Sequence, residues 1–144
     1  MRFWDTSALV PLLVHEATTA ALAKLYRGED AVIAWWGTAV ECASAVARLE
    51  RAGQLAARAT STALARLDAL ADTWHVIEPT DAVRQGARRL LRAHDLRAGD
   101  ALQLAAAVIA AEGQPGSLEV VCLDERLAMA ALREGFMVVD RARL

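Results

Sequence analysis

The sequence contains few of the residues that mark secreted, zinc-binding or membrane-spanning proteins. Only two of its 144 residues are cysteines, Cys42 and Cys122, and they form no Cys-x-x-Cys pair. This excludes a disulfide framework and a zinc ribbon, and free cysteines are typical of the reducing cytosol. The longest apolar run, residues 101–111, contains Gln103 and falls well short of the ~20 residues that a membrane-spanning helix needs. We therefore expect a cytoplasmic protein with no membrane segment.

Neither sign of charge dominates. The chain has 16 basic and 18 acidic residues, a net charge of −2, and Lys24 is its only lysine. This balance excludes nucleic-acid binding through overall charge, although a local cluster can still bind. Arginines are concentrated in one stretch, where each of them alone is explained by a solvent-exposed helix face. As a group they are candidate contacts to the phosphates of a nucleic acid, namely Arg84, Arg88, Arg92 and Arg97.

Proline and glycine are scarce, with 3 and 8 residues, and no linker, repeat or low-complexity segment divides the chain. Hydrophobic residues make up 56% of the sequence, which excludes intrinsic disorder. The length is that of one ordinary domain. We therefore expect a single domain over residues 1–144.

Short apolar segments alternate with longer, often alanine-rich segments of helical character. We predict strands at residues 2–4, 31–35, 74–77, 118–123 and 136–139, and helices at 8–14, 16–26, 38–51, 54–71, 81–94, 99–111 and 125–133. Such alternation favours a parallel sheet with helices on both faces, and continuous apolar strands fit that double coverage. The predicted fold is a three-layer α/β/α sandwich with a mostly parallel sheet of about five strands.

Four acidic residues fall at equivalent places relative to these elements. Asp5 and Asp124 directly follow predicted strands, and Glu41 and Asp100 fall in the first turns of helices. Functional groups of open α/β sheets gather outside the carboxyl ends of the strands, so we expect the four carboxylates to converge. Each acid alone also has a structural explanation, because acids cap helix N-termini. Thr38 and Glu41 even match the spacing of a capping box.

Convergence of four carboxylates requires something to offset their repulsion. Carboxylates within ~4–6 Å raise one another's pKa unless a proton or a cation intervenes. A donor set of oxygens alone, without histidine or cysteine, suits Mg²⁺ or Mn²⁺ rather than zinc. One or two such ions can hold a phosphodiester, lower the pKa of a bound water and stabilise the leaving oxygen. The pattern therefore indicates a metal-dependent nuclease.

Four segments together carry a resemblance to a known family. They are residues 5–9 (DTSAL), Glu41, residues 96–107 (LRAGDALQLAAA) and residues 122–131 (CLDERLAMAA). In motif order, spacing and total length the chain resembles PIN-domain proteins, specifically the toxin of a VapBC-type toxin–antitoxin pair. The resemblance implies a PIN fold and a Mg²⁺- or Mn²⁺-dependent endoribonuclease that hydrolyses RNA phosphodiesters.

The resemblance also implies roles for individual residues. Asp5 and Asp100 would be the most direct metal ligands, Glu41 would complete the site or orient the water, and Asp124 would support the metal cluster, so that all four are catalytic and metal-binding candidates.

The residues beside these acids have implied roles as well. Thr6 and Ser7 are expected to hydrogen-bond a site carboxylate or a phosphate oxygen, although both are equally good helix caps. One position departs from the family pattern. Many relatives carry Thr or Ser where this chain has Cys122, which weakens the polar support expected around Asp124.

Partners are implied by the resemblance rather than by the residues. Proteins of this kind are usually homodimers that a small antitoxin inhibits, with its C-terminal segment lying along the acidic groove. Trp35 and Trp36, with the helix at residues 16–26, are a candidate partner surface. Partly buried packing explains these tryptophans equally well.

Two alternative functions stay open. One is a catalytically silent PIN-fold module that binds RNA or protein. The other is a phosphatase of the haloacid dehalogenase type, which presents an aspartate nucleophile after its first strand. That class needs a second aspartate where this chain has Ser7, and Lys24 comes too early for its lysine. His75, Met129 and Met137 are predicted to be packing residues.

Overall fold

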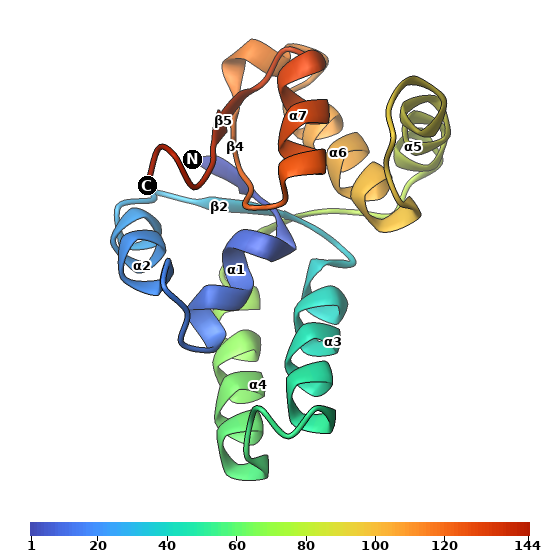
Figure 1. Cartoon of the computed structure of the whole chain (residues 1–144). Coiled ribbons are helices and arrows are strands. Elements are labelled where there is room, and N and C mark those ends of the chain that lie inside the picture. Colours follow the sequence, from blue (N-terminus) through green and yellow to red (C-terminus); the bar gives the residue numbers. More distant parts are fainter.

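The computed structural model describes residues 1–144 and contains one five-stranded sheet (Figure 1). The strands are β1 (Arg2–Trp4), β2 (Val32–Trp35), β3 (His75–Ile77), β4 (Glu119–Val121) and β5 (Met137–Val139). They pair in the order β3-β2-β1-β4-β5, and every pairing is parallel. The predicted α/β fold with about five strands is therefore confirmed.

Helices connect the strands throughout. They are α1 (Thr6–Leu13), α2 (Thr19–Arg27), α3 (Thr38–Arg51), α4 (Ala57–Ala71), α5 (Asp81–Ala93), α6 (Ala98–Ala110) and α7 (Glu125–Arg133), with a 3-10 turn at Pro115–Ser117. None of these helices has the length and apolar character needed to cross a bilayer.

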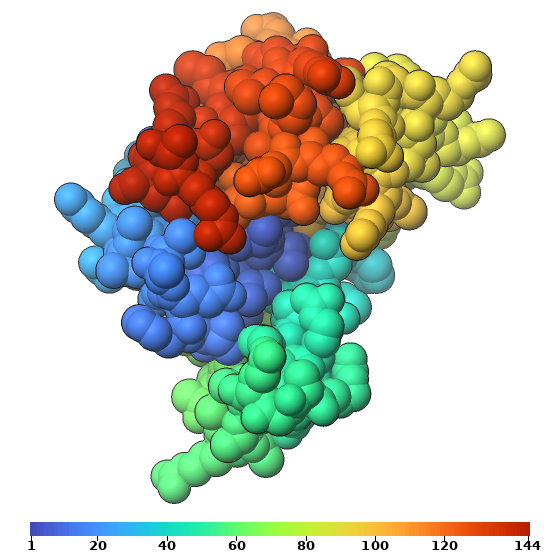
Figure 2. All heavy atoms as spheres, in the orientation of Figure 1, coloured from blue at the N-terminus to red at the C-terminus, as the bar shows by residue number.

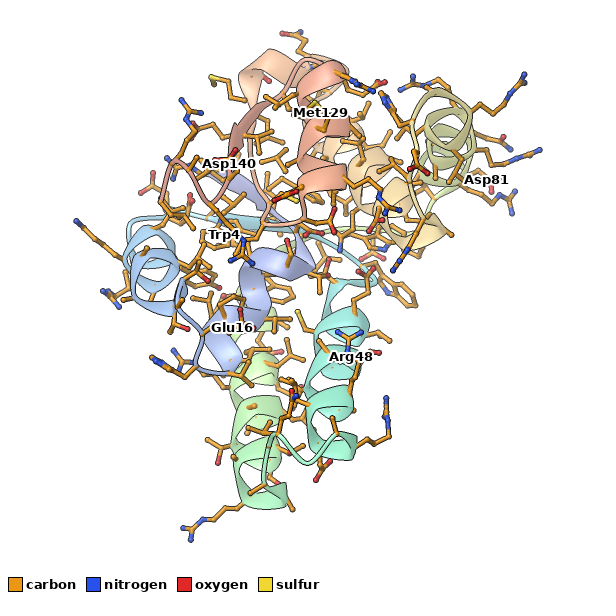
Figure 3. The ribbon with its side chains drawn as sticks, in the orientation of Figure 1. Trp4, Glu16, Arg48, Asp81, Met129 and Asp140 are labelled. Atoms are coloured by element: carbon orange, nitrogen blue, oxygen red, sulfur yellow. The ribbon has the colours of Figure 1, made fainter.

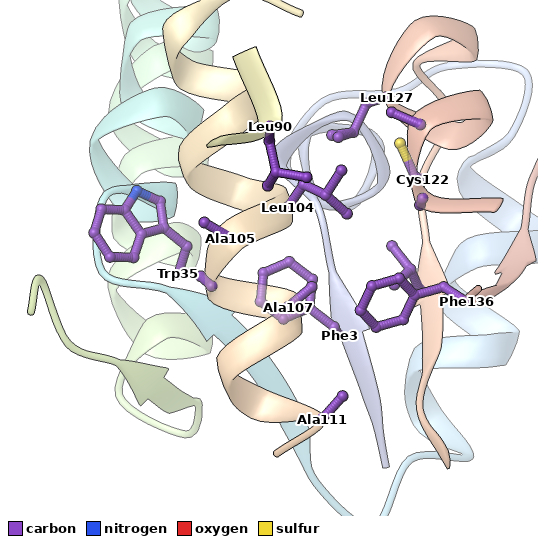
Figure 4. Close-up of a cluster of buried hydrophobic side chains, with 14 of the residues drawn as sticks. Phe3, Trp35, Leu90, Leu104, Ala105, Ala107, Ala111, Cys122, Leu127 and Phe136 are labelled. Atoms are coloured by element: carbon purple, nitrogen blue, oxygen red, sulfur yellow. The ribbon is translucent and has the colours of Figure 1, made fainter. Parts of the chain in front are cut away.

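Neighbouring residues of β1, β2, β4 and β5 face opposite helical layers. In β1, Phe3 packs into one hydrophobic core and Trp4 into another, and in β4 Val120 and Val121 divide in the same way. Helices α5, α6 and α7 complete the first core, and α1 to α4 complete the second. Figure 4 shows Phe3 with Leu104 of α6 in the first core. The sheet is thus the middle layer of three, as the apolar strands predicted.

The strand order reverses between β1 and β4. The chain passes from β1 to β2 and β3 on one side, then returns to place β4 and β5 on the other side of β1. In sheets of this kind the crevice outside the carboxyl ends of the strands at the reversal point is the usual binding site. In the sequence, Asp5 directly follows β1, and Asp124 is the third residue after the end of β4.

The edges of the sheet are less covered than predicted. β3 is an edge strand, and His75 on it is exposed rather than half-buried in packing. Met129 and Met137 are 51% and 48% exposed, so their prediction as core residues was wrong. Met129 lies on the solvent-facing side of α7, and Met137 begins the other edge strand. Apolar residues at such positions occur on most protein surfaces.

Four helices begin at residues other than predicted, and one of them, α6, begins one residue early at Ala98. α1 begins at Thr6 because the Asp5 side chain accepts a hydrogen bond from the Ser7 backbone N–H and so caps the helix. Pro11 consequently lies inside α1. α2 and α4 begin later than expected, at Thr19 and Ala57.

A buried ion pair links the start of the sheet to the loop before β2. The Glu29 side chain is only 2% exposed and accepts hydrogen bonds from the Arg2 guanidinium at 2.8 Å and the Trp4 indole at 3.3 Å. The Met1 amino group lies 3.2 Å from the other Glu29 oxygen, and Arg2 also pairs with Glu119 at 2.6 Å. Removing one member of such a pair leaves a buried charge with fewer partners.

We expect Arg2→Met to destabilise the protein by about 2 kcal/mol, less than for a fully enclosed pair because Arg2 is 27% exposed. Glu29→Gln should lower the free energy of unfolding by less, because Arg2 keeps Glu119 as a partner. Urea unfolding of the two variants measures the difference. Equal costs would mean that the buried Glu29 charge does not determine the stability of this corner.

Candidate functional site

The four predicted acids come from four different parts of the chain and line one pocket of about 660 Å³, and Glu16 is a fifth acidic residue of its lining. Asp5 follows β1, Glu41 lies in the first turn of α3, Asp100 lies in the first turn of α6, and Asp124 precedes α7. Figure 2 shows the dark-blue N-terminal segment, teal α3 and the yellow-to-orange C-terminal half meeting around this region. The predicted convergence of the four acids on one pocket is therefore observed.

Ser7 joins Asp5 to the end of β4. Its hydroxyl donates to the Asp5 carboxylate and accepts from the backbone N–H groups of Leu123 and Asp124, at 2.8 and 3.2 Å. The Asp5 backbone N–H in turn donates to the Val121 carbonyl at 3.0 Å. One hydroxyl thus fixes the Asp5 carboxylate against the segment that carries Asp124.

A second network holds Glu41. The Thr6 hydroxyl donates to Glu41 Oε2 at 3.0 Å, and the amide nitrogen of Gln103 donates to the same oxygen at 3.2 Å. Gln103 also donates to the hydroxyls of Thr6, at 2.8 Å, and Thr38, at 3.1 Å. Gln103 is 1% exposed and Thr38 is fully buried, so α6 supports α3 beneath the pocket through an enclosed polar contact.

The capping box predicted for Thr38 and Glu41 does not form. Gly37 is the N-cap of α3 and no side chain caps it, because the Thr38 hydroxyl bonds to Gln103 and Glu41 bonds to Thr6. Asp5 and Asp124 are N-caps, accepting from the backbone N–H groups of Ser7 and Leu127. Capping a helix and lining the pocket therefore coexist at these two acids, while Glu41 caps nothing.

The acids influence one another in two pairs. Burial raises the pKa of Asp5 to about 6, against the lowering effect of its bonds from Ser7, and the Glu41 charge raises this pKa further. Burial also raises the pKa of Asp100, opposed by its hydrogen bond from the Arg97 backbone N–H, and the Asp124 charge adds to the increase. Both pairs of carboxylates are therefore placed to gain from a cation between them.

The geometry fits a hydrated hard cation better than a closed metal cage. No three histidine, cysteine, aspartate or glutamate side chains come together tightly enough to enclose an ion by themselves. Mg²⁺ keeps several waters and is usually held by one or two carboxylates together with substrate phosphates. The two carboxylate pairs, which contain only oxygen donors, match that requirement.

Cys122 faces the site in spite of its apolar character. Its thiol is fully buried and lies 3.6 Å from Asp5 Oδ2 and 3.8 Å from the Ser7 hydroxyl. Burial, together with the Asp5 charge, raises the pKa of this thiol, so it stays neutral. The thiol also lies 3.4 Å from the backbone carbonyl of Asp124, to which it can donate, but it does not touch the Asp124 carboxylate.

The candidate RNA-binding arginines are divided between different surfaces. Arg97 lines the acidic pocket, whereas Arg88 and Arg92 line a separate shallow hollow along α5. Arg84 is exposed and pairs with Asp81 at 2.8 Å. Only Arg97 of the predicted set therefore lies beside the acids.

Sequence reasoning missed three other residues at the site, namely Glu16, Arg48 and Gln103. Arg48 of α3 lines the pocket and forms no salt bridge. Figure 3 labels it, with Glu16 beyond the end of the neighbouring α1. Gln103 was visible as the one polar residue in the apolar run of residues 101–111, and a buried amide in such a run is a signal for a polar partner.

Comparisons with known proteins found relatives by sequence and by structure. No family model matches the chain. Ribonuclease VapC45 of Mycobacterium tuberculosis is 35% identical over 140 residues, covering 94% of this chain and 92% of the relative. The crystal structure of FitAcB from Neisseria gonorrhoeae matches with a TM-score of 0.69 at 19% identity over the whole of both chains. VapBC2 from Rickettsia felis, bound to a DNA fragment from their promoter, matches with a TM-score of 0.65 at 10% identity, over 96% and 97% of the chains.

The two structural matches show the fold alone, because their sequences have diverged so far. The relationship to VapC45 is closer and extends over nearly the full length of both sequences. On that relationship, and with the fold and the acidic pocket in agreement, the chain belongs to the VapC family of PIN-domain ribonucleases.

Proposed function

We propose that this protein is a divalent-metal-dependent endoribonuclease that acts as the toxin of a toxin–antitoxin pair. The observation that carries the proposal is the meeting of four carboxylates and two arginines in one pocket, at the point where the strand order reverses. The VapC relatives are named ribonucleases, and matched solved structures include a toxin–antitoxin complex from Klebsiella pneumoniae.

In this proposal Asp5 with Glu41, and Asp100 with Asp124, hold the metal. A bound Mg²⁺ or Mn²⁺ ion supplies Lewis-acid activation of water and charge stabilisation at the phosphate. Ser7 keeps the Asp5 carboxylate turned toward the pocket, and Thr6 does the same for Glu41.

The two arginines of the pocket provide the contacts to RNA. Arg48 and Arg97 are exposed and have no salt-bridge partner, so both guanidinium groups are free to bind phosphates on either side of the cleaved bond. The arginines of α5 are spaced to bind phosphates farther along the RNA.

We further propose that a small antitoxin inhibits the enzyme and that the toxin is a homodimer. An acidic pocket accepts a basic side chain as readily as it accepts a metal ion. An antitoxin segment with an arginine or lysine would thus occupy the site and replace both the metal and the RNA.

The proposal predicts cleavage of total RNA that requires both a divalent ion and Asp100. Discrete fragments should form with Mg²⁺ or Mn²⁺, and they should be absent with EDTA or with the Asp100→Asn variant. The substitution is nearly isosteric at a half-buried side chain, so the fold should be retained. Gel electrophoresis of the RNA and circular dichroism of the protein measure the two results.

Asp72→Asn is the matched control, because Asp72 is an exposed aspartate at the end of α4 that does not line the pocket. This variant should cleave as the wild type does. If folded, metal-loaded wild-type protein leaves every RNA intact but still binds RNA, the protein is a silent binding module instead.

A further inference from the structure

Trp36 is the one tryptophan of this chain that is open to solvent. Its side chain is 55% exposed, whereas Trp4, Trp35 and Trp74 are between 0% and 9% exposed. Large aromatic side chains usually bury most of their surface, since they contribute much of the hydrophobic stabilisation of a core. An exposed tryptophan close in sequence to residues of the acidic pocket is therefore a candidate for binding a ligand.

The indole of Trp36 is held in place rather than free. The backbone N–H of Trp36 donates to the Ile77 carbonyl at 3.1 Å, which fixes the chain at the end of β2. Its ring packs edge-on against buried Trp35, with 6.4 Å between centroids and 67° between planes. The Trp35 indole lies so close to Gly37 that a Cβ there would be 2.5 Å from its Nε1. This close packing fixes Trp35 and thereby orients Trp36.

Trp36 does not itself line the acidic pocket, but it lies close in sequence to two residues that do, Val40 and Glu41. It follows β2 at the same edge of the sheet at which Asp5 follows β1. One helical turn farther on, Val40 lines the pocket and is 66% exposed, and the next residue is Glu41. An exposed aromatic ring and an exposed aliphatic side chain therefore lie within five residues of the Glu41 carboxylate along the chain.

We propose that Trp36 is a stacking platform for a base of single-stranded RNA next to the cleaved phosphate. The inference rests on the proposed function and adds a recognition element to it. The pocket offers carboxylates for metal and two arginines for phosphates, but its lining contains no aromatic ring. Proteins that bind single-stranded RNA stack unpaired bases on aromatic rings. Trp36 is the exposed ring nearest in sequence to a site carboxylate.

Tryptophan fluorescence tests the contact directly, because the other three indoles are buried. We expect a short single-stranded RNA of mixed sequence to quench the fluorescence of the Asp100→Asn protein, which binds RNA without cleaving it. Replacement of Trp36 by Phe in that protein should remove most of the quenching while binding, followed by anisotropy of labelled RNA, continues. An abasic oligonucleotide should bind without quenching. RNA binding that leaves Trp36 fluorescence unchanged would overturn the proposal and assign the exposed indole to a protein partner.

Kinetics on otherwise wild-type protein gives a second readout. Trp36→Ala should raise KM by about 10-fold with little change in kcat, and Trp36→Phe should restore most of the loss. Ile109→Ala is the matched control, because Ile109 is 41% exposed but lies at the opposite end of α6 from Asp100. Wild-type kinetics for Trp36→Ala would refute the stacking role but would leave the proposed function standing. Failure of the wild-type protein to bind or cleave any RNA would refute the proposed function as well.

Discussion

Replacing Asp5 with asparagine should abolish RNA cleavage and, in the absence of metal, make the folded protein more stable. Loss of a central carboxylate of a catalytic unit typically lowers turnover by on the order of 1,000-fold or more. The substitution keeps the cap of α1, because the asparagine oxygen can still accept from the Ser7 backbone N–H. It also removes a charge that is almost completely buried, since Asp5 is 4% exposed.

The gain in stability should depend on pH. The Asp5 pKa is about 6 in the folded protein, against 3.8 for the ordinary side chain, because burial disfavours the charged form. The folded state therefore binds this proton more tightly than the unfolded state does. The stabilisation that comes from binding this proton to Asp5 is complete below pH 3.8 and is lost as the pH rises through 6. The difference of about two pH units corresponds to about 3 kcal/mol.

Urea unfolding in EDTA measures this effect. Asp5→Asn and wild type should have similar stability near pH 4, and the variant should be more stable by up to about 3 kcal/mol at pH 8. Asp124→Asn is the control, since Asp124 caps α7 in the same way but is exposed. A loss of stability for Asp5→Asn at both pH values would show that the carboxylate is needed mainly as a cap.

The order of strands and helices could be predicted because each element carries its own local signal. Val120 and Val121 mark a buried strand, and Asp124 followed by Glu125 marks the start of a helix. The errors arose where burial depends on distant parts of the chain. Whether β3 lies at an edge or in the centre depends on the strand order, so the exposure of His75 could not be derived from its neighbours in sequence.

The four acids of the site could be predicted for a similar reason. Each stands at the end of a strand or the start of a helix, and parallel strands bring such positions to one edge. The support beneath the acids could not be predicted, because it joins residues far apart in sequence. Gln103 contacts Thr6 and Glu41 across 97 and 62 positions, and nothing local links α6 to α3.

Replacing Gln103 with methionine should lower both stability and activity. Methionine is close to glutamine in size but lacks the amide, so the Thr38 hydroxyl, which is fully buried, loses its partner. A buried polar group without a partner costs about 1–3 kcal/mol, and we expect about 3 kcal/mol because Thr6 and Glu41 lose a donor as well. Cleavage should fall by roughly 10- to 100-fold, the usual cost of losing a group that orients metal ligands.

A second substitution separates these two effects. Thr38→Val in the Gln103→Met background removes the other buried polar group, and replacing both partners of a hydrogen bond by apolar groups of similar shape can be nearly neutral. Unfolding in urea should thus show most of the lost stability recovered, whereas RNA cleavage should stay low because Thr6 and Glu41 still lack the amide donor. If the double variant regains activity together with stability, Gln103 contributes only to folding. Recovery of stability alone means that the amide holds Glu41 in the orientation the site requires.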